Sequence, residues 1–337
     1  MTPGPTRMPE RVRRAGARPM IHHRTAEFSR ELAEALELLA PVYGTRGVPL
    51  PVHTTGRGAL EATICNLFAA GDEIVVCCNG KFGELWATLA ESYGVVVHRV
   101  AAAWGADVAP AELDALLDEH AAVRAVAVAY ADTSTAVAND VPSLARVARA
   151  HGALVLVDAV AALGGMPFAF DEWEVDVAVT ASQKCLMSSP GLAWVAMSDR
   201  AWQASSRARL PRNYWNFAGI HRAVSRPRPE TPGTPPVQVV LQNAEALRVI
   251  HEEGLENVYT RHDAMARRVR NALPALGLAP HFPNVARSAA TVSAIALPGL
   301  APAAVREALR ARGVLTAAGL GACAASGFRI GHMGDIR

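Results

Sequence analysis

The chain has 337 residues, of which 51% are hydrophobic and 19% are charged, and its formal net charge is +2. This composition is typical of a globular protein with a sizeable core and excludes a disordered chain. The small net charge gives no reason to expect nucleic acid or a membrane as a partner. No apolar run reaches the roughly 18 residues of a transmembrane helix, and the N-terminus lacks the apolar core of a signal peptide, so a cytoplasmic location is expected.

The cysteines are scattered, odd in number and free of any Cys-x-x-Cys motif: Cys65, Cys77, Cys78, Cys185 and Cys323. We expect them to be reduced, buried thiols. The pair His22-His23 has no acidic or cysteine partner at ligand spacing, and no metal site is predicted.

The N-terminal part opens on a turn-rich, extended segment around Gly4, and apolar residues at helical spacing follow over 27–39. A second helix is predicted after the glycine-rich turn Thr55-Gly56-Arg57. Such a turn presents backbone N–H groups and the positive end of the helix dipole to an anion. A plain helix start without a ligand is the competing interpretation.

Strand and helix patterns alternate through the middle of the chain. Apolar runs predict strands over 72–78, 94–100, 123–130, 154–157, 175–179 and 192–197, and helices are predicted after 79–83 and over 110–119 and 142–151. This rhythm predicts right-handed βαβ units and a mostly parallel sheet, hence an α/β fold. Polar residues cluster where these strands end, and ligands bind at that edge of such sheets.

Asp158 follows one buried run, and Lys184 follows the next in the series Thr180-Ala181-Ser182-Gln183-Lys184. An amine and a carboxylate placed together at a sheet edge suit pyridoxal phosphate (PLP) chemistry. The lysine forms the Schiff base with the cofactor aldehyde, and the acid keeps the pyridine nitrogen protonated. By spacing alone, a surface ion pair explains the two residues equally well.

The C-terminal third contains a proline-dense segment over 226–236, which reads as a stiff linker, and helices are predicted over 237–253 and 254–272. A smaller α/β domain follows, with strands over 289–296 and 328–331 around a helix over 303–312. We therefore expect an N-terminal segment over 1–20, a large domain over 21–235 and a small domain over 236–337.

The segment VDAVAALGGMPFAFDEWEVDVAVTASQK with the following SSPG, and the segment GFRIGHMG over 327–334, resemble the class V aminotransferases, in particular their alanine–glyoxylate and serine–pyruvate branch. The resemblance spans nearly the whole chain. It implies the fold type I architecture of PLP enzymes, which is aspartate aminotransferase-like, and a homodimer. Relatives continue beyond the position of Arg337 into a C-terminal helix, so the small domain is expected to lack its last helix.

The resemblance also implies roles for single residues. Lys184 would bind PLP, Asp158 would pair with its pyridinium nitrogen, and Arg329 would clamp the substrate carboxylate, as guanidinium groups do. Gly4 would lie across the mouth of the active site. The remaining cofactor contacts would come from Thr55, Gly56, Arg57, Phe82, Thr133, Ser182, Gln183 and, across a dimer interface, Thr234 of the neighbouring subunit.

The activity that this branch implies is transfer of the amino group of alanine or serine to glyoxylate or pyruvate by a ping-pong mechanism. Departures from the family pattern at His22, Arg57 and the aromatic stretch 213–217 leave a PLP-dependent lyase as an alternative. A non-catalytic remnant is a third hypothesis, against which the joint retention of Lys184, Asp158 and Arg329 argues.

Overall fold

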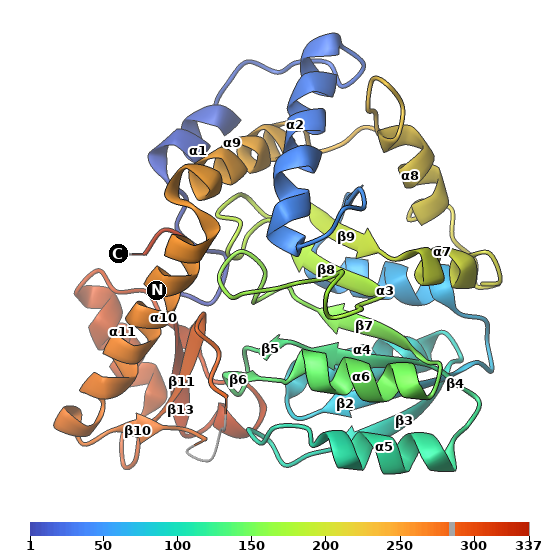
Figure 1. The fold of residues 1–337 in the computed structure, drawn as a ribbon. Coiled ribbons are helices and arrows are strands. Elements are labelled where there is room, and N and C mark those ends of the chain that lie inside the picture. Colours follow the sequence, from blue (N-terminus) through green and yellow to red (C-terminus); the bar gives the residue numbers. More distant parts are fainter. Residues whose placement is uncertain (283–286, 337) are drawn as a thin grey trace.

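A seven-stranded sheet forms the centre of the computed structural model, which describes residues 1–282 and 287–336 (Figure 1). The strand order is β1-β9-β8-β7-β4-β2-β3. Their bounds are β1 (Leu50–Val52), β2 (Glu73–Cys78), β3 (Val96–Ala101), β4 (Val123–Ala129), β7 (Leu154–Asp158), β8 (Val177–Ala181) and β9 (Ala193–Met197).

The sheet is mostly parallel, as predicted. Strands β3, β2, β4, β7 and β8 run parallel to one another, whereas β9 is antiparallel to β8 and β1 is antiparallel to β9. The predicted strand over 192–197 therefore exists but runs opposite to β8, because only a short loop connects the two and a parallel pair needs a long crossover. Every residue of β7 and β8 is buried, which explains their continuous apolar runs.

Helices connect and cover these strands. Among the helices that pack on the sheet are α3 (Gly56–Leu67), α4 (Lys81–Ser92), α5 (Pro110–Glu119) and α6 (Val141–Ala150). Five more in the first 253 residues are α1 (Glu10–Gly16), α2 (Ala26–Tyr43), α7 (Asp199–Ser205), α8 (Phe217–Val224) and α9 (Val237–Glu253). The sequence predicted α2, α3, α4, α5, α6 and α9, but α1, α7 and α8 are too short to show a clear apolar period.

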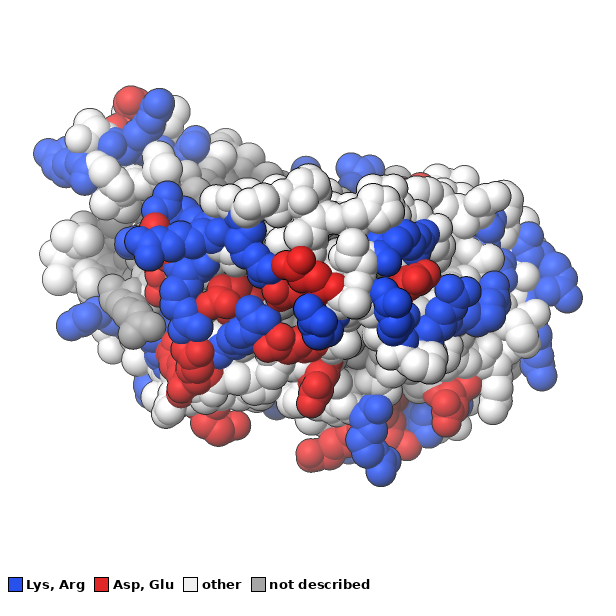
Figure 2. Space-filling view, turned by 90° about the horizontal axis from the view of Figure 1, so that it is seen from above, with Lys and Arg blue, Asp and Glu red and all other residues white. Residues whose placement is uncertain are grey.

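Helix α2 packs against α9, and both are anchored to β9 through buried hydrogen bonds. The hydroxyl of Tyr43 donates to the carbonyl of Trp194 at 2.8 Å, and the indole of Trp194 donates to Asn243 at 3.1 Å. Arg248 of α9 forms ion pairs with Glu34 of α2 and with Glu245. On the face of the molecule seen from above, basic and acidic side chains lie next to one another over its middle (Figure 2).

A second, antiparallel sheet lies beside the large one (Figure 1) in the order β10-β11-β13-β12. Its strands are β10 (Ala279–Pro280), β11 (Val292–Ala296), β12 (Ala317–Ala318) and β13 (Gly327–Gly331), and its helices are α10 (Leu255–Ala272) and α11 (Pro302–Ala311), with 3-10 turns η1 (Pro274–Leu276) and η2 (Gly321–Cys323). A two-stranded ribbon of β5 (Ala131–Asp132) and β6 (Val137–Ala138) follows β4. The strand predicted over 289–296 begins only at Val292, and Arg337 lies outside the described residues.

The N-terminal segment crosses from this second sheet to the large one. The amide of Gly331 in β13 donates to the carbonyl of Met1 at 2.9 Å, and the amide of Thr6 donates to the carbonyl of Gln183, beyond β8, at 3.0 Å. The first six residues thus bridge both sheets next to Lys184. Within the described part of the chain, no helix has the length and apolarity to cross a membrane.

Candidate active site

The ends of the central strands bring together the polar residues that the sequence singled out. Asp158 is the last residue of β7, and Lys184 comes three residues after the end of neighbouring β8. The two side chains are close enough for the charge of each to shift the pKa of the other. Parallel pairing of β7 with β8 produces this meeting, since it places both strand ends at one edge.

Asp158 is a buried carboxyl group whose pKa is raised. Its side chain is almost fully buried and accepts one hydrogen bond from the amide of Val160 at 2.9 Å. Burial raises the pKa of Asp158 to about 6, against the opposing effects of the Val160 amide and Lys184. A cationic partner at the second oxygen would stabilise the ionised form of this buried carboxyl group.

Lys184 is a buried amine. Loss of hydration lowers the pKa of Lys184 from its ordinary value, as expected for a desolvated ammonium. Its Nζ donates to the carbonyl of Pro3, and the hydroxyl of Thr6 donates to the Lys184 carbonyl at 2.9 Å. The N-terminal segment therefore covers the lysine and fixes its backbone.

Gly4 provides the close approach that this cover requires. It has a φ of +103°, and a Cβ added there would lie 2.5 Å from Cδ and 2.8 Å from Nζ of Lys184. Both the left-handed backbone and the short distance favour glycine at this position. Gly4 therefore lies beside Lys184, and its expected place across the mouth of the active site stays a prediction.

Helix α3 begins at the same edge of the sheet. Its first residue, Gly56, is buried, and a Cβ there would lie 2.7 Å from a methyl group of Val160, two residues after Asp158. The N-cap residue Thr55 makes no side-chain capping bond, so the first-turn N–H groups of this 12-residue helix are open to another acceptor. The side chains of Thr55 and Arg57 are exposed.

Ser182 and Gln183 lie between β8 and Lys184. The hydroxyl of Ser182 donates to the carbonyl of Ser189 at 2.6 Å, which closes the loop after the lysine. The Oε1 atom of Gln183 is buried and has no hydrogen-bond partner among the described residues. A buried acceptor without a donor is costly, and this position therefore calls for a partner that the chain itself does not supply.

Asp132 was not singled out from the sequence, yet it organises the start of α4. Its fully buried carboxylate accepts from the amide of Phe82 at 2.8 Å and from the amide and hydroxyl of Ser134 at 2.8 and 2.5 Å. A Cβ on Gly80 would collide with this carboxylate at 2.5 Å. The bond to the Phe82 amide fixes the backbone at this half-buried aromatic residue. Gly80, two residues before Phe82, and the acidic residue in the Asp132–Thr135 cluster were the available signals.

Arg329 reaches the site from β13 of the second sheet. Its Nε donates to the Ala318 carbonyl at 2.8 Å and its Nη1 to the Thr133 carbonyl at 3.0 Å. Among the described residues these guanidinium hydrogen bonds go to carbonyl and hydroxyl oxygens, and none goes to a carboxylate. Burial lowers the pKa of Arg329 from its ordinary value. The side chain is thus a buried cation next to Thr133 that forms no salt bridge with a carboxylate among the described residues.

Like Thr55 and Arg57, the predicted site residue Thr234 is exposed in the single chain. It lies in the proline-dense loop between α8 and α9. In the same loop, Thr231 is buried and its hydroxyl donates to the Gly233 carbonyl at 2.7 Å. The contact expected for Thr234 with a neighbouring subunit stays a prediction.

Comparisons with known proteins agree with one another over the whole chain. A family model described as "Aminotransferase class-V" matches residues 8–336. A protein named "soluble hydrogenase, small subunit" from Synechococcus sp. is 37% identical over 100% of this chain and 88% of its own length. An L-aspartate–glyoxylate aminotransferase from Paracoccus denitrificans is also 37% identical, over 99% of this chain and 86% of its own. The crystal structure of an alanine–glyoxylate aminotransferase from Nostoc sp. superposes with a TM-score of 0.94 at 30% identity, covering 99% of this chain and 89% of that one.

Proposed function

Since the chain belongs to the class-V aminotransferase family, we propose that it transfers the amino group of a small amino acid, such as alanine or serine, to glyoxylate or pyruvate in two half-reactions. The enzyme is a PLP-dependent transaminase of fold type I. The observation that supports the site assignment best is the buried amine of Lys184 beside the buried carboxyl of Asp158, next to a buried arginine that forms no salt bridge with a carboxylate among the described residues.

The residues at the sheet edge fit PLP. The open N-terminus of α3 suits the cofactor phosphate, and the unpartnered Oε1 of Gln183 accepts a hydrogen bond that the chain does not provide. Asp158, with its raised pKa, gains a cationic partner in the protonated ring nitrogen. The residues proposed to hold the phosphate or ring are Thr55, Gly56, Arg57, Phe82, Thr133, Ser182 and Gln183.

When bound, PLP supplies an electron sink next to the substrate's α-carbon. Lys184 would hold the cofactor covalently and then, as a free amine, would take the proton from the substrate's α-carbon as a base and deliver it as an acid to C4′, the cofactor carbon that carries the aldehyde. Its lowered pKa favours the neutral, basic form that this task needs. Asp158 keeps the proton on the ring nitrogen, and Arg329 orients the substrate through its α-carboxylate.

A homodimer is part of this proposal. In it, Thr234 of one subunit contacts the PLP phosphate bound to the other, so that each site needs both chains. The exposure of Thr234 in a stiff, proline-dense loop supports this arrangement, because the side chain is free to meet a partner. Mass measurement of the native protein in solution tests it: a monomer with full activity would contradict the shared site.

The name of the relative from Synechococcus sp. suggests a hydrogenase, an activity that the cysteines of this chain do not support. Iron–sulfur clusters are held by sets of cysteine thiolates. All five cysteines here are free and buried, and the one group of three metal-competent side chains among the described residues contains no cysteine.

The chain has only two lysines, Lys81 and Lys184, which makes a sharp test available. Lys81 is exposed at the start of α4 and provides a matched control. Borohydride reduction of the purified holoenzyme, followed by peptide mass spectrometry, should place the cofactor on Lys184. The visible absorbance of bound PLP should be lost in Lys184→Ala and kept in Lys81→Ala.

The same absorbance band of bound PLP can be used to identify the substrates. Alanine, serine and aspartate are added one at a time, and a true donor bleaches the band, which glyoxylate or pyruvate then restores. Release of ammonia without any need for an oxo acid would instead establish the lyase alternative. Reduction that labels Lys81, or no label at all with excess PLP, would overturn the assignment of Lys184.

A further inference from the structure

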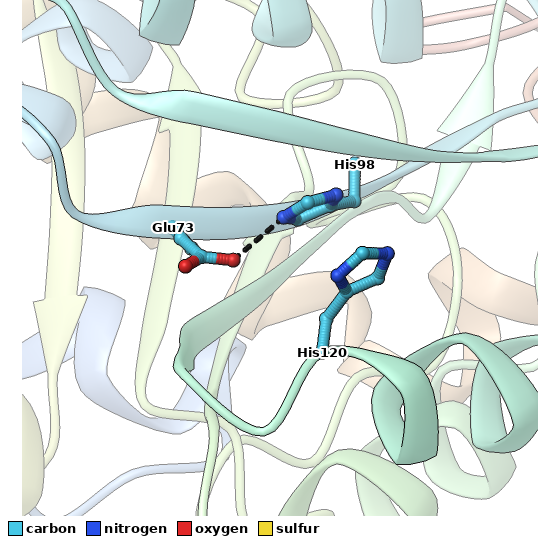
Figure 3. A group of neighbouring side chains, drawn as sticks. All are labelled: Glu73, His98 and His120. Carbon is cyan, nitrogen blue, oxygen red and sulfur yellow. Dashed lines mark hydrogen bonds and ion pairs between the residues drawn. The ribbon is translucent and has the colours of Figure 1, made fainter.

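A second group of chemically competent side chains lies away from the PLP site. Glu73, His98 and His120 meet at the edge of the large sheet, and their potential ligand atoms all lie within 4.8 Å of one another (Figure 3). Across residues 1–282 and 287–336, no other three histidine, cysteine or acidic side chains come together in this way. The proposed transamination uses none of the three.

The fold explains why these residues meet. In the parallel pairing of β2 with β3, Glu73 lies opposite Val96 and Val75 lies opposite His98, so Glu73 and His98 point to the same face of the sheet. Helix α5 packs on β3, and His120 is its C-cap residue. Three separate elements thus each contribute one ligand. Glu73 begins β2, whereas Asp158 ends β7, so the group lies near the amino ends of the strands, opposite the PLP edge.

The contacts within the group are one hydrogen bond and one ring stack. His98 Nε2 and Glu73 Oε2 are 2.7 Å apart, and the rings of His98 and His120 stack with centroids 3.7 Å apart. The side chains of His98 and Glu73 are 18% and 28% exposed, so an ion could enter and keep water in its remaining positions. No cation from the chain is paired with Glu73 in the described residues, apart from His98 when it is protonated.

We propose that Glu73, His98 and His120 form a binding site for a divalent transition-metal ion of the zinc type. Two imidazole nitrogens and one carboxylate oxygen are a borderline donor set that suits such ions and not calcium or magnesium. Donors around one tetrahedral zinc ion stand about 3.4 Å apart. The ion therefore replaces the proton between His98 and Glu73, and the ring of His120 turns out of the stack to direct a nitrogen toward it.

The site would act as a clamp on the edge of the sheet. Strand β3 is the outermost strand, and only β2 pairs with it. An ion bound to all three residues would link β2, β3 and the turn after α5, which lie far apart in sequence. Because such an ion binds the folded chain, it should raise the melting temperature, and removal of any ligand should cancel that increase.

The test uses the untagged, PLP-loaded full-length protein, treated with a chelator and titrated with Zn²⁺ by calorimetry. We expect one ion per chain in wild type and a loss of affinity of at least about ten-fold in each of Glu73→Gln, His98→Gln and His120→Gln. His151→Gln is the matched control, since this nearby histidine is paired with Asp114 and lies outside the group. With Co²⁺ as probe, the visible d–d bands should appear in wild type and the control and be absent in the three variants.

Transaminase activity serves as the folding check, because none of these variants touches the PLP edge. Absence of Zn²⁺ and Co²⁺ binding to the active wild-type protein would overturn the proposal and leave a hydrogen-bonded, stacked trio without an ion. Equal binding by the active ligand variants would also overturn it, since the ion would then lie elsewhere.

Discussion

Replacement of Gly4 by alanine tests whether the N-terminal segment fixes the reactive amine. The added Cβ would lie 2.5 Å from Cδ and 2.8 Å from Nζ of Lys184. Carbon atoms pack at about 3.5–4.0 Å, so either the lysine or residues 1–6 must shift by about 1 Å. A misplacement of that size at a reacting group costs about 100-fold in rate, and we expect a fall of this order in kcat/KM.

A left-handed φ also strains any alanine, by roughly 1–2 kcal/mol, and this effect needs its own control. Gly71 has a φ of +84°, and a Cβ there would meet no atom within 4 Å. Gly71→Ala should therefore lose a similar amount of stability in urea unfolding and keep wild-type kcat/KM. If Gly4→Ala stayed within about two-fold of Gly71→Ala in kcat/KM, the argument that Gly4 positions Lys184 would be refuted.

Three further predictions concern the charged residues around the site. The pKa of Asp158 is raised, so its contribution to the stability of the cofactor-free protein is present below the ordinary carboxyl pKa and lost as pH rises through about 6. We expect the unfolding free energy of the wild type, measured in urea relative to that of Asp158→Asn, to fall by up to about 3 kcal/mol when the pH is raised from 4 to above 6. If the difference between the two proteins were the same at both pH values, a raised pKa of Asp158 would be excluded. In Arg329→Lys, the side chain cannot bind a carboxylate in a bidentate manner, and the hydrogen bonds to the Ala318 and Thr133 carbonyls are lost. The KM for the amino donor should therefore rise about ten-fold or more, while the absorbance of bound PLP is retained. An unchanged KM would show that the substrate carboxylate binds elsewhere. Asp132→Ala leaves buried donors at the start of α4 unpaired, which should cost about 3 kcal/mol of unfolding free energy, and a loss below that of an ordinary cap, about 1 kcal/mol, would contradict this role.

The local sequence determined the elements that carry a strong pattern. The continuous apolar runs of β7 and β8 indicated buried parallel strands, and the helix predicted over 237–253 has those bounds in the structure. Asp158 and Lys184 were visible because an ionisable residue at or just beyond the end of a buried run is rare without a reason. The cofactor chemistry followed from these two residues and the resemblance around them.

Tertiary structure alone decided the place of Asp132 and the cover over Lys184. The bond between Lys184 and Pro3 joins positions 181 residues apart, and Glu73, His98 and His120 meet only because β2 and β3 pair and α5 packs on β3. Such contacts arise from burial and hydrogen bonding between distant segments, and periodicity and spacing within one segment do not record them.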